Sequence, residues 1–313
     1  MALDIIPMRE QHLESAATLA AASCRVLRVG LPILPIDCEK PGSFLPLLRE
    51  IIQAYSGVVA MRDGKIAGFM AGLIIPDFLG RRCAYCPEWA NATVGSDARL
   101  LYEEMYTRLC AKWVADGCRL HAVSVMPTPA DGLVALQQSG FGMVSVEAVR
   151  DLSPVQGPAA TVTIRQAAMR DVGMILKLEE AVTRHLAGSP VFWPHEELDY
   201  TLWLRQPGRA MWLAMDRNRC LGMLGVQQNN PDGSLILRDD KTVSISTLFT
   251  AEPSRRMGIA TALLNRALQW AQANNYERCA VSFQLVNYAA ARLVLKRFKP
   301  VAYSLLRWIP EGA

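Results

Sequence analysis

The most informative pattern of apolar and polar positions lies between residues 243 and 271. Its first part, VSISTLFT, is apolar and rich in β-branched residues, which is typical of a strand, and a Pro-Ser pair then interrupts it. The second part places apolar residues at i, i+4, i+8 and i+11, namely Ile259, Leu263, Ala267 and Trp270. This stretch therefore predicts a strand, a turn and an amphipathic helix.

The turn between that strand and helix has the composition of an anion-binding site. Arg255 and Arg256 precede Gly258, where we expect the helix to begin. The first N–H groups of a helix have no partner within the helix, and the helix dipole is positive there. Glycine allows close approach because it has no Cβ atom. We therefore expect this turn to bind a phosphate group.

A similar order of elements occurs twice in the chain. Short strings such as Ala60-Met61 and Ala214-Met215 align in the same order at a nearly constant offset, which indicates an internal duplication. We predict domains at 1–152 and 161–313, joined by a proline- and glycine-containing linker at 153–160. Helices are expected at residues 11–24, 98–115, 130–138, 169–185, 196–205, 258–273 and 288–296. Strands alternate with these helices, so the predicted fold class is α/β, with a mixed, mostly antiparallel sheet flanked by helices in each domain.

Composition narrows the function classes. The chain has 313 residues, of which 51% are hydrophobic and 20% charged, and this suits two soluble globular domains. The net charge of +4 comes without a dense basic stripe, so we expect no nucleic-acid partner. There is no apolar run of membrane-spanning length and no signal-peptide layout, so we expect a cytoplasmic protein without a membrane partner, as a monomer or a homodimer.

Cys83 and Cys86 form a C-x-x-C motif within a set of eight cysteines that we expect to remain reduced. No second cysteine pair or close Cys/His pair accompanies them, which favours coincidence over a metal or redox role, although both remain open. His185 and His195 also lack the spacing of a metal site, so no metal is expected.

The residues Arg-x-x-Gly-x-Ala at 255–260, with a helix, a strand at 278–283 and Asn287 after them, resemble the acyl-CoA pyrophosphate loop of the GNAT superfamily of N-acetyltransferases. The resemblance implies tandem GNAT-like folds over nearly the whole chain, and acetyl-CoA as co-substrate of the second domain. The residues it assigns to acetyl-CoA are Leu248, Phe249, Thr250, Arg255, Arg256, Met257, Gly258, Ile259, Ala260, Thr261 and Asn287.

The first copy lacks this loop. Leu100 and Tyr102 align with Gly258 and Ala260, and we expect their side chains to take the space of a pyrophosphate. Residues 95–97 still supply a helix cap, so the first domain is predicted to fold as a degenerate copy that binds no acetyl-CoA.

The catalytic groups are less well matched. Many members of the family carry a Glu on the strand before the loop and a Tyr in the last helix, but here Ser244 is nearest to the Glu position, and Val294 or Leu293 to the Tyr position. We expect Ser244 to relay a proton through water and Tyr288 or Tyr303 to act as the acid. Each tyrosine also fits the edge of a core, and Asn287 also fits a helix cap.

The acceptor-binding segment is expected between residues 189 and 200. Phe192, Trp193, Glu196 and Tyr200 combine aromatic and acidic groups that would suit a cationic amine, although a helix start at the surface would look the same. The leading hypothesis is an acetyl-CoA-dependent N-acetyltransferase that acts on a small-molecule amine by direct transfer, without an acyl intermediate on Cys279. The alternative is a non-catalytic acyl-CoA-binding or interaction protein. A dinucleotide enzyme is disfavoured because no G-x-G-x-x-G motif accompanies the loop.

Overall fold

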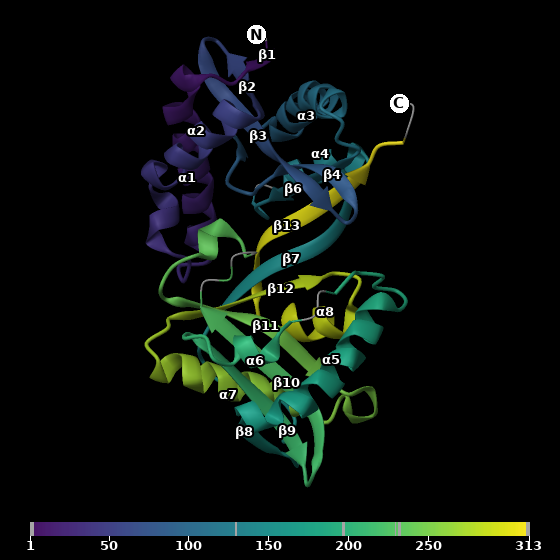
Figure 1. Cartoon of the computed structure of the whole chain (residues 1–313). Coiled ribbons are helices and arrows are strands. Elements are labelled where there is room, and N and C mark those ends of the chain that lie inside the picture. The colour runs from purple at the N-terminus through teal and green to yellow at the C-terminus, as the bar shows by residue number, and fades with distance from the viewer. Residues whose placement is uncertain (1–2, 129, 196–197, 229, 231–232, 311–313) are drawn as a thin grey trace. The chain divides into compact units, whose positions relative to one another are not determined.

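The computed structural model of the protein describes residues 3–128, 130–195, 198–228, 230 and 233–310. The chain forms two compact units (Figure 1). Unit 1 contains residues 1–146, 234–236 and 300–313, and unit 2 contains residues 147–233 and 237–299. Each unit combines a mixed sheet with helices, which confirms the predicted α/β class.

Unit 1 is a sheet in the order β1-β2-β3-β4-β6-β13, with β5 paired to β3. Only the β4·β6 pair is parallel among the pairs described for this unit. Its strands are β1 (Leu3–Pro7), β2 (Ser56–Arg62), β3 (Lys65–Phe78), β4 (Arg81–Cys86), β5 (Asn91–Thr93), β6 (Leu120–Val125) and, from residue 300 on, β13 (Lys299–Trp308). Its helices are α1 (Leu13–Gly30), α2 (Leu45–Ala54), α3 (Ala98–Ala115) and α4 (Asp131–Gln138).

Unit 2 is a sheet in the order β7-β12-β11-β10-β9-β8. Its strands are β8 (Thr163–Gln166), β9 (Arg209–Asp216), β10 (Arg219–Gln228), β11 (Thr242–Thr250), β12 (Arg278–Gln284) and, from residue 147 on, β7 (Gly142–Asp151). Its helices are α5 (Val172–Ala187), α6 (Tyr200–Trp203), α7 (Ile259–Ala273) and α8 (Tyr288–Val294).

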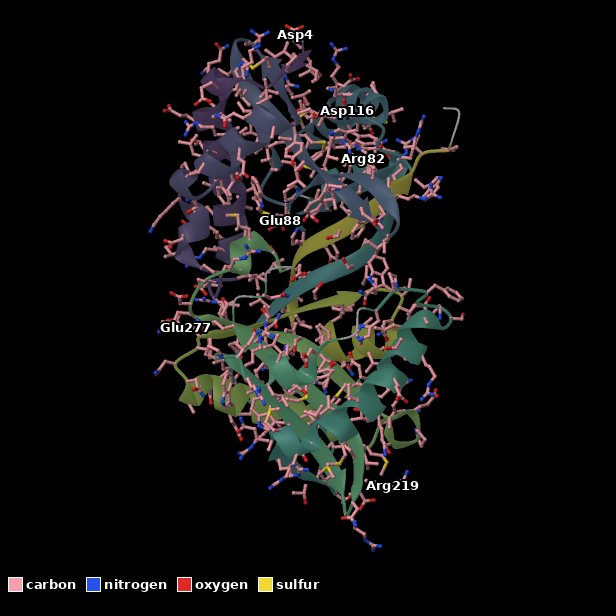
Figure 2. The ribbon with its side chains drawn as sticks, viewed as in Figure 1. Asp4, Arg82, Glu88, Asp116, Arg219 and Glu277 are labelled. Atoms are coloured by element: carbon pink, nitrogen blue, oxygen red, sulfur yellow. The ribbon has the colours of Figure 1, made fainter. Side chains whose placement is uncertain are left out.

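Each unit takes its last strand from the other half of the sequence. β7 follows α4 in the chain but neighbours β12 in unit 2, and β13 follows α8 but pairs with β6 from Tyr303↔Val125 to Trp308↔Leu120. Residues 234–236 also belong to unit 1, where Glu88 accepts hydrogen bonds from the Ser234 hydroxyl at 2.6 Å and the Leu235 N–H at 3.0 Å; Glu88 is labelled in Figure 2. The linker at 153–160 therefore stays a prediction of where one sequence repeat ends and the next begins. Dividing the chain there would leave each unit without one of its strands.

Helices cover both faces of the unit 2 sheet. Along β9, Met211 and Leu213 pack with residues of α5 and α6, whereas Trp212 between them meets Trp270 of α7 at a ring distance of 5.8 Å. Side chains alternate between the faces of a strand, so α5 and α6 lie on one face and α7 on the other. The two faces of β11 therefore look toward different helices.

The helix predictions hold for α3 and nearly for α7, which begins at Ile259 after Gly258. The helix predicted at 196–205 is shorter: α6 covers Tyr200–Trp203, and residues 196 and 197 lie outside the described part. Its start is fixed by Asp199, which accepts a hydrogen bond from the Leu202 N–H at 3.0 Å. None of the helices found among the described residues is long and apolar enough to cross a membrane.

Candidate active site

The two central strands of unit 2 separate after a short stretch of pairing. β11 and β12 run parallel and pair only from Thr242↔Arg278 to Ile245↔Val281. The rest of β11, residues 246–250, has no neighbour on that side within the described part of the chain. The backbone N–H and C=O groups that point away from β10, other than the Thr250 carbonyl, are therefore available to an extended ligand that adds as a strand.

A β-bulge marks the point of separation. In the β10·β11 register, Gly225 faces Thr247 and Val226 faces Ile245, so Ser246 is the extra residue. A Cβ atom on Gly225 would lie 2.8 Å from the Ser246 hydroxyl, which explains the glycine. The Ser246 hydroxyl is buried without a hydrogen-bond partner in the described structure. The bulge thus places a free polar group beside the unpaired part of β11.

The N-terminus of α7 offers a row of free donors. The backbone N–H groups of residues 258–261 have no hydrogen-bond partner among the described residues. Gly258 caps the helix in the left-handed conformation, with φ of 77°, and Arg256 before it also has a positive φ of 67°. This backbone turn directs unpaired donors at the positive end of a 15-residue helix, as an anion site requires.

The two arginines of the turn differ in their contacts. The Arg255 Nε atom donates to the Thr250 carbonyl at 3.3 Å, and the guanidinium lies 6.0 Å from the Phe249 ring centre. Arg255 also lies 3.7 Å from Glu252, whose side chain is largely exposed. Arg256 is exposed to solvent. The turn therefore holds one cation against the end of β11 and a second at the surface.

The structure gives Gly258 a second role that the sequence did not suggest. A Cβ atom there would lie 2.3 Å from the Pro158 carbonyl oxygen, so the linker occupies the position that a side chain at 258 would take. The linker is held on α7 by Asn265, which donates to the Val155 carbonyl at 2.9 Å and accepts from the Val155 N–H at 2.7 Å. Glycine is needed at 258 for chain packing, whether or not a ligand binds.

The corresponding region of unit 1 is closed. Helices α3 and α4 pack directly, because the Tyr102 ring lies against Gly132, where a Cβ atom would be 2.6 Å away. In unit 2, the backbones of α7 and α8 do not pack closely in this way. The expectation that Tyr102 fills the phosphate position was wrong in its geometry: Tyr102 is buried and donates to the Asn91 Oδ1 atom at 2.8 Å, while Leu100 is exposed.

The start of α3 also carries the wrong charge for a phosphate. Asp97 is its N-cap residue, although its side chain forms an ion pair with Arg62 and not the predicted cap. The hydrogen bond from Arg62 lowers the pKa of Asp97, so the carboxylate stays charged beside the helix N-terminus.

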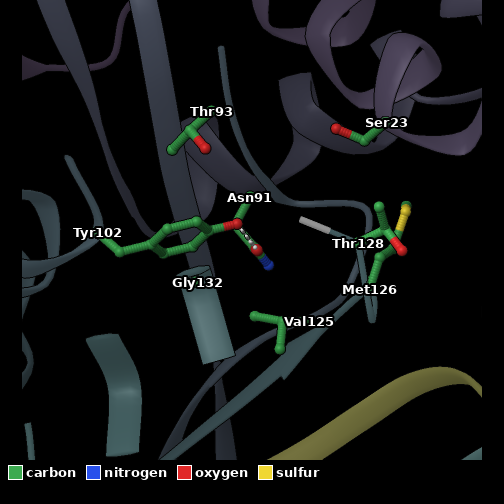
Figure 3. Close-up of a pocket in the computed structure, with 8 residues that line it drawn as sticks. All are labelled: Ser23, Asn91, Thr93, Tyr102, Val125, Met126, Thr128 and Gly132. Carbon is green, nitrogen blue, oxygen red and sulfur yellow. Dashed lines mark hydrogen bonds between the residues drawn. The ribbon is translucent and has the colours of Figure 1, made fainter. Parts of the chain in front are cut away.

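Unit 1 instead contains a small polar pocket beside the buried Tyr102–Asn91 hydrogen bond (Figure 3). It is lined by Ser23, Asn91, Thr93, Tyr102, Val125, Met126, Thr128 and Gly132. The cavity volume is about 10 Å³, which suits a single water molecule and not a cofactor.

The three predicted acid–base residues are placed differently. Ser244 is buried in the paired part of β11, opposite Ala280 of β12. Tyr288 is 58% exposed at the first position of α8. Tyr303 pairs with Val125 in unit 1 and is not part of the unit that carries the loop. Unit 2 itself therefore contributes Ser244 and Tyr288 from this set, and their roles stay predictions.

The structure brings His185 to this region, a residue that the sequence analysis considered only to reject it as a metal ligand. Its Nε2 atom lies 3.2 Å from Asn287 Oδ1, and its ring centre is 6.3 Å from that of Phe249. Asn287 caps α8 by accepting a hydrogen bond from the Ala290 N–H, as predicted for the cap. No spacing in the sequence signals this contact, because the two partners are 102 positions apart.

The predicted acceptor segment is tied to α5 by a buried carboxylate. Glu179 is 4% exposed, accepts from the Tyr200 hydroxyl at 2.6 Å, and lies 2.6 Å from His195 Nε2. Tyr200 is buried in the core, whereas Phe192 is 71% exposed. The sequence signal that could have revealed this cluster is Glu179 itself, because it is a Glu within the apolar stripe of a helix.

Two further members of the predicted acceptor set can be placed only in part. The Trp193 N–H donates to the Leu186 carbonyl at 2.9 Å, which folds the segment back along α5. Glu196 lies outside the described residues. Their contact with an acceptor stays a prediction.

Cys83 and Cys86 do not form a reactive pair. Cys83 and Cys86 lie three positions apart on β4, so their side chains point to opposite faces of the strand, and burial raises the pKa of each to about 12. Every cysteine is a free thiol. Among the described residues, no cluster of three His, Cys, Asp or Glu side chains could hold a metal ion.

Comparisons with known proteins agree with this geometry. Residues 178–298 match the model of the acetyltransferase (GNAT) family. Streptothricin acetyltransferase A of Bacillus subtilis (strain 168) is 25% identical over 115 residues, which is 36% of this chain and 61% of that protein, so the match spans less than two thirds of the relative.

Solved structures of other proteins share the fold. A GCN5-related N-acetyltransferase from Sphaerobacter thermophilus has a TM-score of 0.60 at 15% identity and covers 99% of this chain and 97% of its own. A glucosamine N-acetyltransferase region of a fungal multi-domain β-N-acetylglucosaminidase has a TM-score of 0.53 at 11% identity, covering 97% of this chain and 38% of its own. Residues 178–298, which contain β11, β12 and the loop of unit 2, are thus the part of the chain that is similar to the GNAT family of acetyltransferases.

Proposed function

We propose that the chain is an acetyl-CoA-dependent N-acetyltransferase, and that unit 2 transfers the acetyl group directly to a primary amine of a small molecule. The observation that carries the proposal is that two sets of unpaired backbone groups occur in the same unit. Residues 246–250 of β11 have an unpaired edge, and the N–H groups of residues 258–261 have no partner among the described residues. The family match covers both stretches.

The residues of unit 2 fit the parts of acetyl-CoA. The unpaired edge of β11 suits the amide-containing pantetheine arm, because it can pair as an added strand. The N–H groups at the start of α7, with Arg255 and Arg256, suit the pyrophosphate. His185 lies beside Phe249 and within hydrogen-bonding distance of Asn287, so the thioester, which supplies the activated acetyl group, would meet the acceptor there.

The acceptor is proposed to be a small amine that enters beside α5. The segment with Phe192, Trp193, Glu196 and Tyr200 follows this helix in the chain, and Phe192 is exposed. An exposed aromatic side chain suits a cation. The name of the Bacillus relative indicates acetyl transfer to streptothricin, and for this chain we propose only the class of small primary amines.

A two-stage assay tests the proposal. Thermal unfolding is first measured with acetyl-CoA, NADH and ATP, and we expect stabilisation by acetyl-CoA alone, since a ligand stabilises the state that binds it. Release of CoA thiol is then followed with a panel of small primary amines. Stabilisation without thiol release from any amine would support the non-catalytic acyl-CoA-binding alternative, to which the absence of a carboxylate at Ser244 points. Stabilisation by NADH or ATP in place of acetyl-CoA would refute both.

A further inference from the structure

His185 joins three elements of unit 2 at the proposed transfer site. It lies near the end of α5, its Nε2 atom lies 3.2 Å from Asn287 Oδ1 at the start of α8, and its ring neighbours Phe249 of β11. The imidazole is half-buried. It is thus a titratable side chain that touches both the strand proposed to hold the thioester and the helix that follows β12.

The hydrogen bonds around Asn287 determine which ring nitrogen of His185 carries the proton. The Ala290 N–H donates to Asn287 Oδ1, so the oxygen of this amide, and not its NH₂ group, faces both Ala290 and His185. An oxygen can only accept, and so Nε2 of His185 must be the donor. In the neutral imidazole, Nδ1 then has a free lone pair, and no described residue forms a hydrogen bond with it.

We propose that His185 is the general base that removes a proton from the acceptor amine. This inference rests on the proposed function and supplies the base that the sequence lacks at Ser244. A primary amine in neutral water is mostly an ammonium ion, which cannot attack a carbonyl carbon until it loses a proton. Asn287 acts as the orienting partner, because it holds the ring with Nδ1 free and stabilises the charged imidazolium through Nε2–H.

The proton and bond balance is complete. The ammonium gives one proton to Nδ1, and the neutral amine attacks the thioester carbonyl to form the C–N bond. The C–S bond breaks, and the second proton of the former amine passes to the departing thiolate, which yields the amide and CoA thiol. His185 then releases its proton to solvent, so each turnover liberates one proton and needs no further reactant.

The test compares His185→Gln with the unchanged protein on two acceptors. One is the best amine of the panel, and the other is its β,β,β-trifluorinated analogue, which is already neutral at the assay pH because three fluorines strongly lower the basicity of the nitrogen. We expect kcat/KM for the first amine to fall about 100-fold or more, the usual contribution of acid–base catalysis, and that for the neutral amine to fall less than about 5-fold. Lys177→Gln, an exposed change on the same helix, is the matched control and should change neither.

Two more measurements separate a catalytic role from a structural one. Acetyl-CoA affinity of His185→Gln should stay within about 3-fold of the unchanged protein, because the proposed phosphate contacts are made elsewhere. Added imidazole should restore turnover of the ammonium substrate to His185→Gly, which also covers the case in which the glutamine variant folds poorly. Equal losses for both amines, or no loss with either, would overturn the role of His185. Absence of turnover by the unchanged protein would instead refute the proposed function.

Discussion

Replacing Gly258 with alanine separates two demands on this position, the backbone conformation and the linker contact. The φ of 77° costs an alanine about 1–2 kcal/mol. The new Cβ atom would also lie 2.3 Å from the Pro158 carbonyl oxygen, so the linker must retreat. Retreat strains the two hydrogen bonds between Val155 and Asn265, each worth about 1 kcal/mol. We therefore expect a total loss of about 2–4 kcal/mol.

Gly64→Ala is the matched control, because Gly64 has a φ of 76° and an added Cβ atom would meet no other atom within 4 Å. It should cost only the conformational part, about 1–2 kcal/mol. Urea unfolding of both variants measures the difference, and acetyl-CoA titration is performed on the same samples. If Gly258→Ala is no less stable than Gly64→Ala but loses acetyl-CoA binding, then the ligand and not the linker requires the glycine, and our reasoning about the linker is refuted.

Three further predictions concern buried groups. Burial lowers the pKa of His121 to about 4, so the folded state resists protonation of this side chain. The free energy of unfolding should therefore fall by about 3 kcal/mol as the pH drops from 6.5 toward 4. His121→Gln should remove this pH dependence in unfolding curves, and an unchanged dependence would contradict the prediction. Asp171 accepts hydrogen bonds from Arg165 at 2.7 and 2.8 Å, which lowers the pKa of Asp171 to about 2. The contribution of this pair to stability is present above pH 4 and is lost as the pH falls toward 2. Asp171→Asn should therefore cost about 2–3 kcal/mol at pH 7, and a variant of equal stability would show that the pair is unimportant. Burial raises the pKa of Cys279 to about 12, so mass spectrometry should find no acetyl-cysteine there during turnover, and Cys279→Ala should keep its activity; ping-pong kinetics lost in this variant would contradict direct transfer.

Local patterns predicted the strand, turn and helix of the loop because each depends on neighbouring residues. The period of apolar positions placed α7 within one residue of its observed start, and Gly258 does adopt the left-handed conformation. The position of Tyr102 was wrong because a one-dimensional alignment does not say toward which face a helical side chain points. Tyr102 turns into the core, where Asn91 accepts its hydroxyl.

The remaining features depend on contacts between distant parts of the chain. β7 and β13 each join the sheet formed mostly by the other half of the chain, and nothing in the local sequence of either strand indicates this. The same is true of the contact between His185 and Asn287 and of the linker that packs on Gly258. Periodicity reports burial, but not which distant residue provides the neighbour.

Calorimetric titration with acetyl-CoA tests the central claim most directly. The account predicts one site per chain, formed by the turn that contains Arg255 and Arg256. Each arginine contact with phosphate is worth about 1.5–3 kcal/mol, so the double variant Arg255→Glu/Arg256→Glu should weaken binding by at least about 100-fold. Arg266→Glu, an exposed charge change further along α7, should leave binding intact. Two sites per chain, or one site that survives the double variant, would show that acetyl-CoA is not bound at the start of α7.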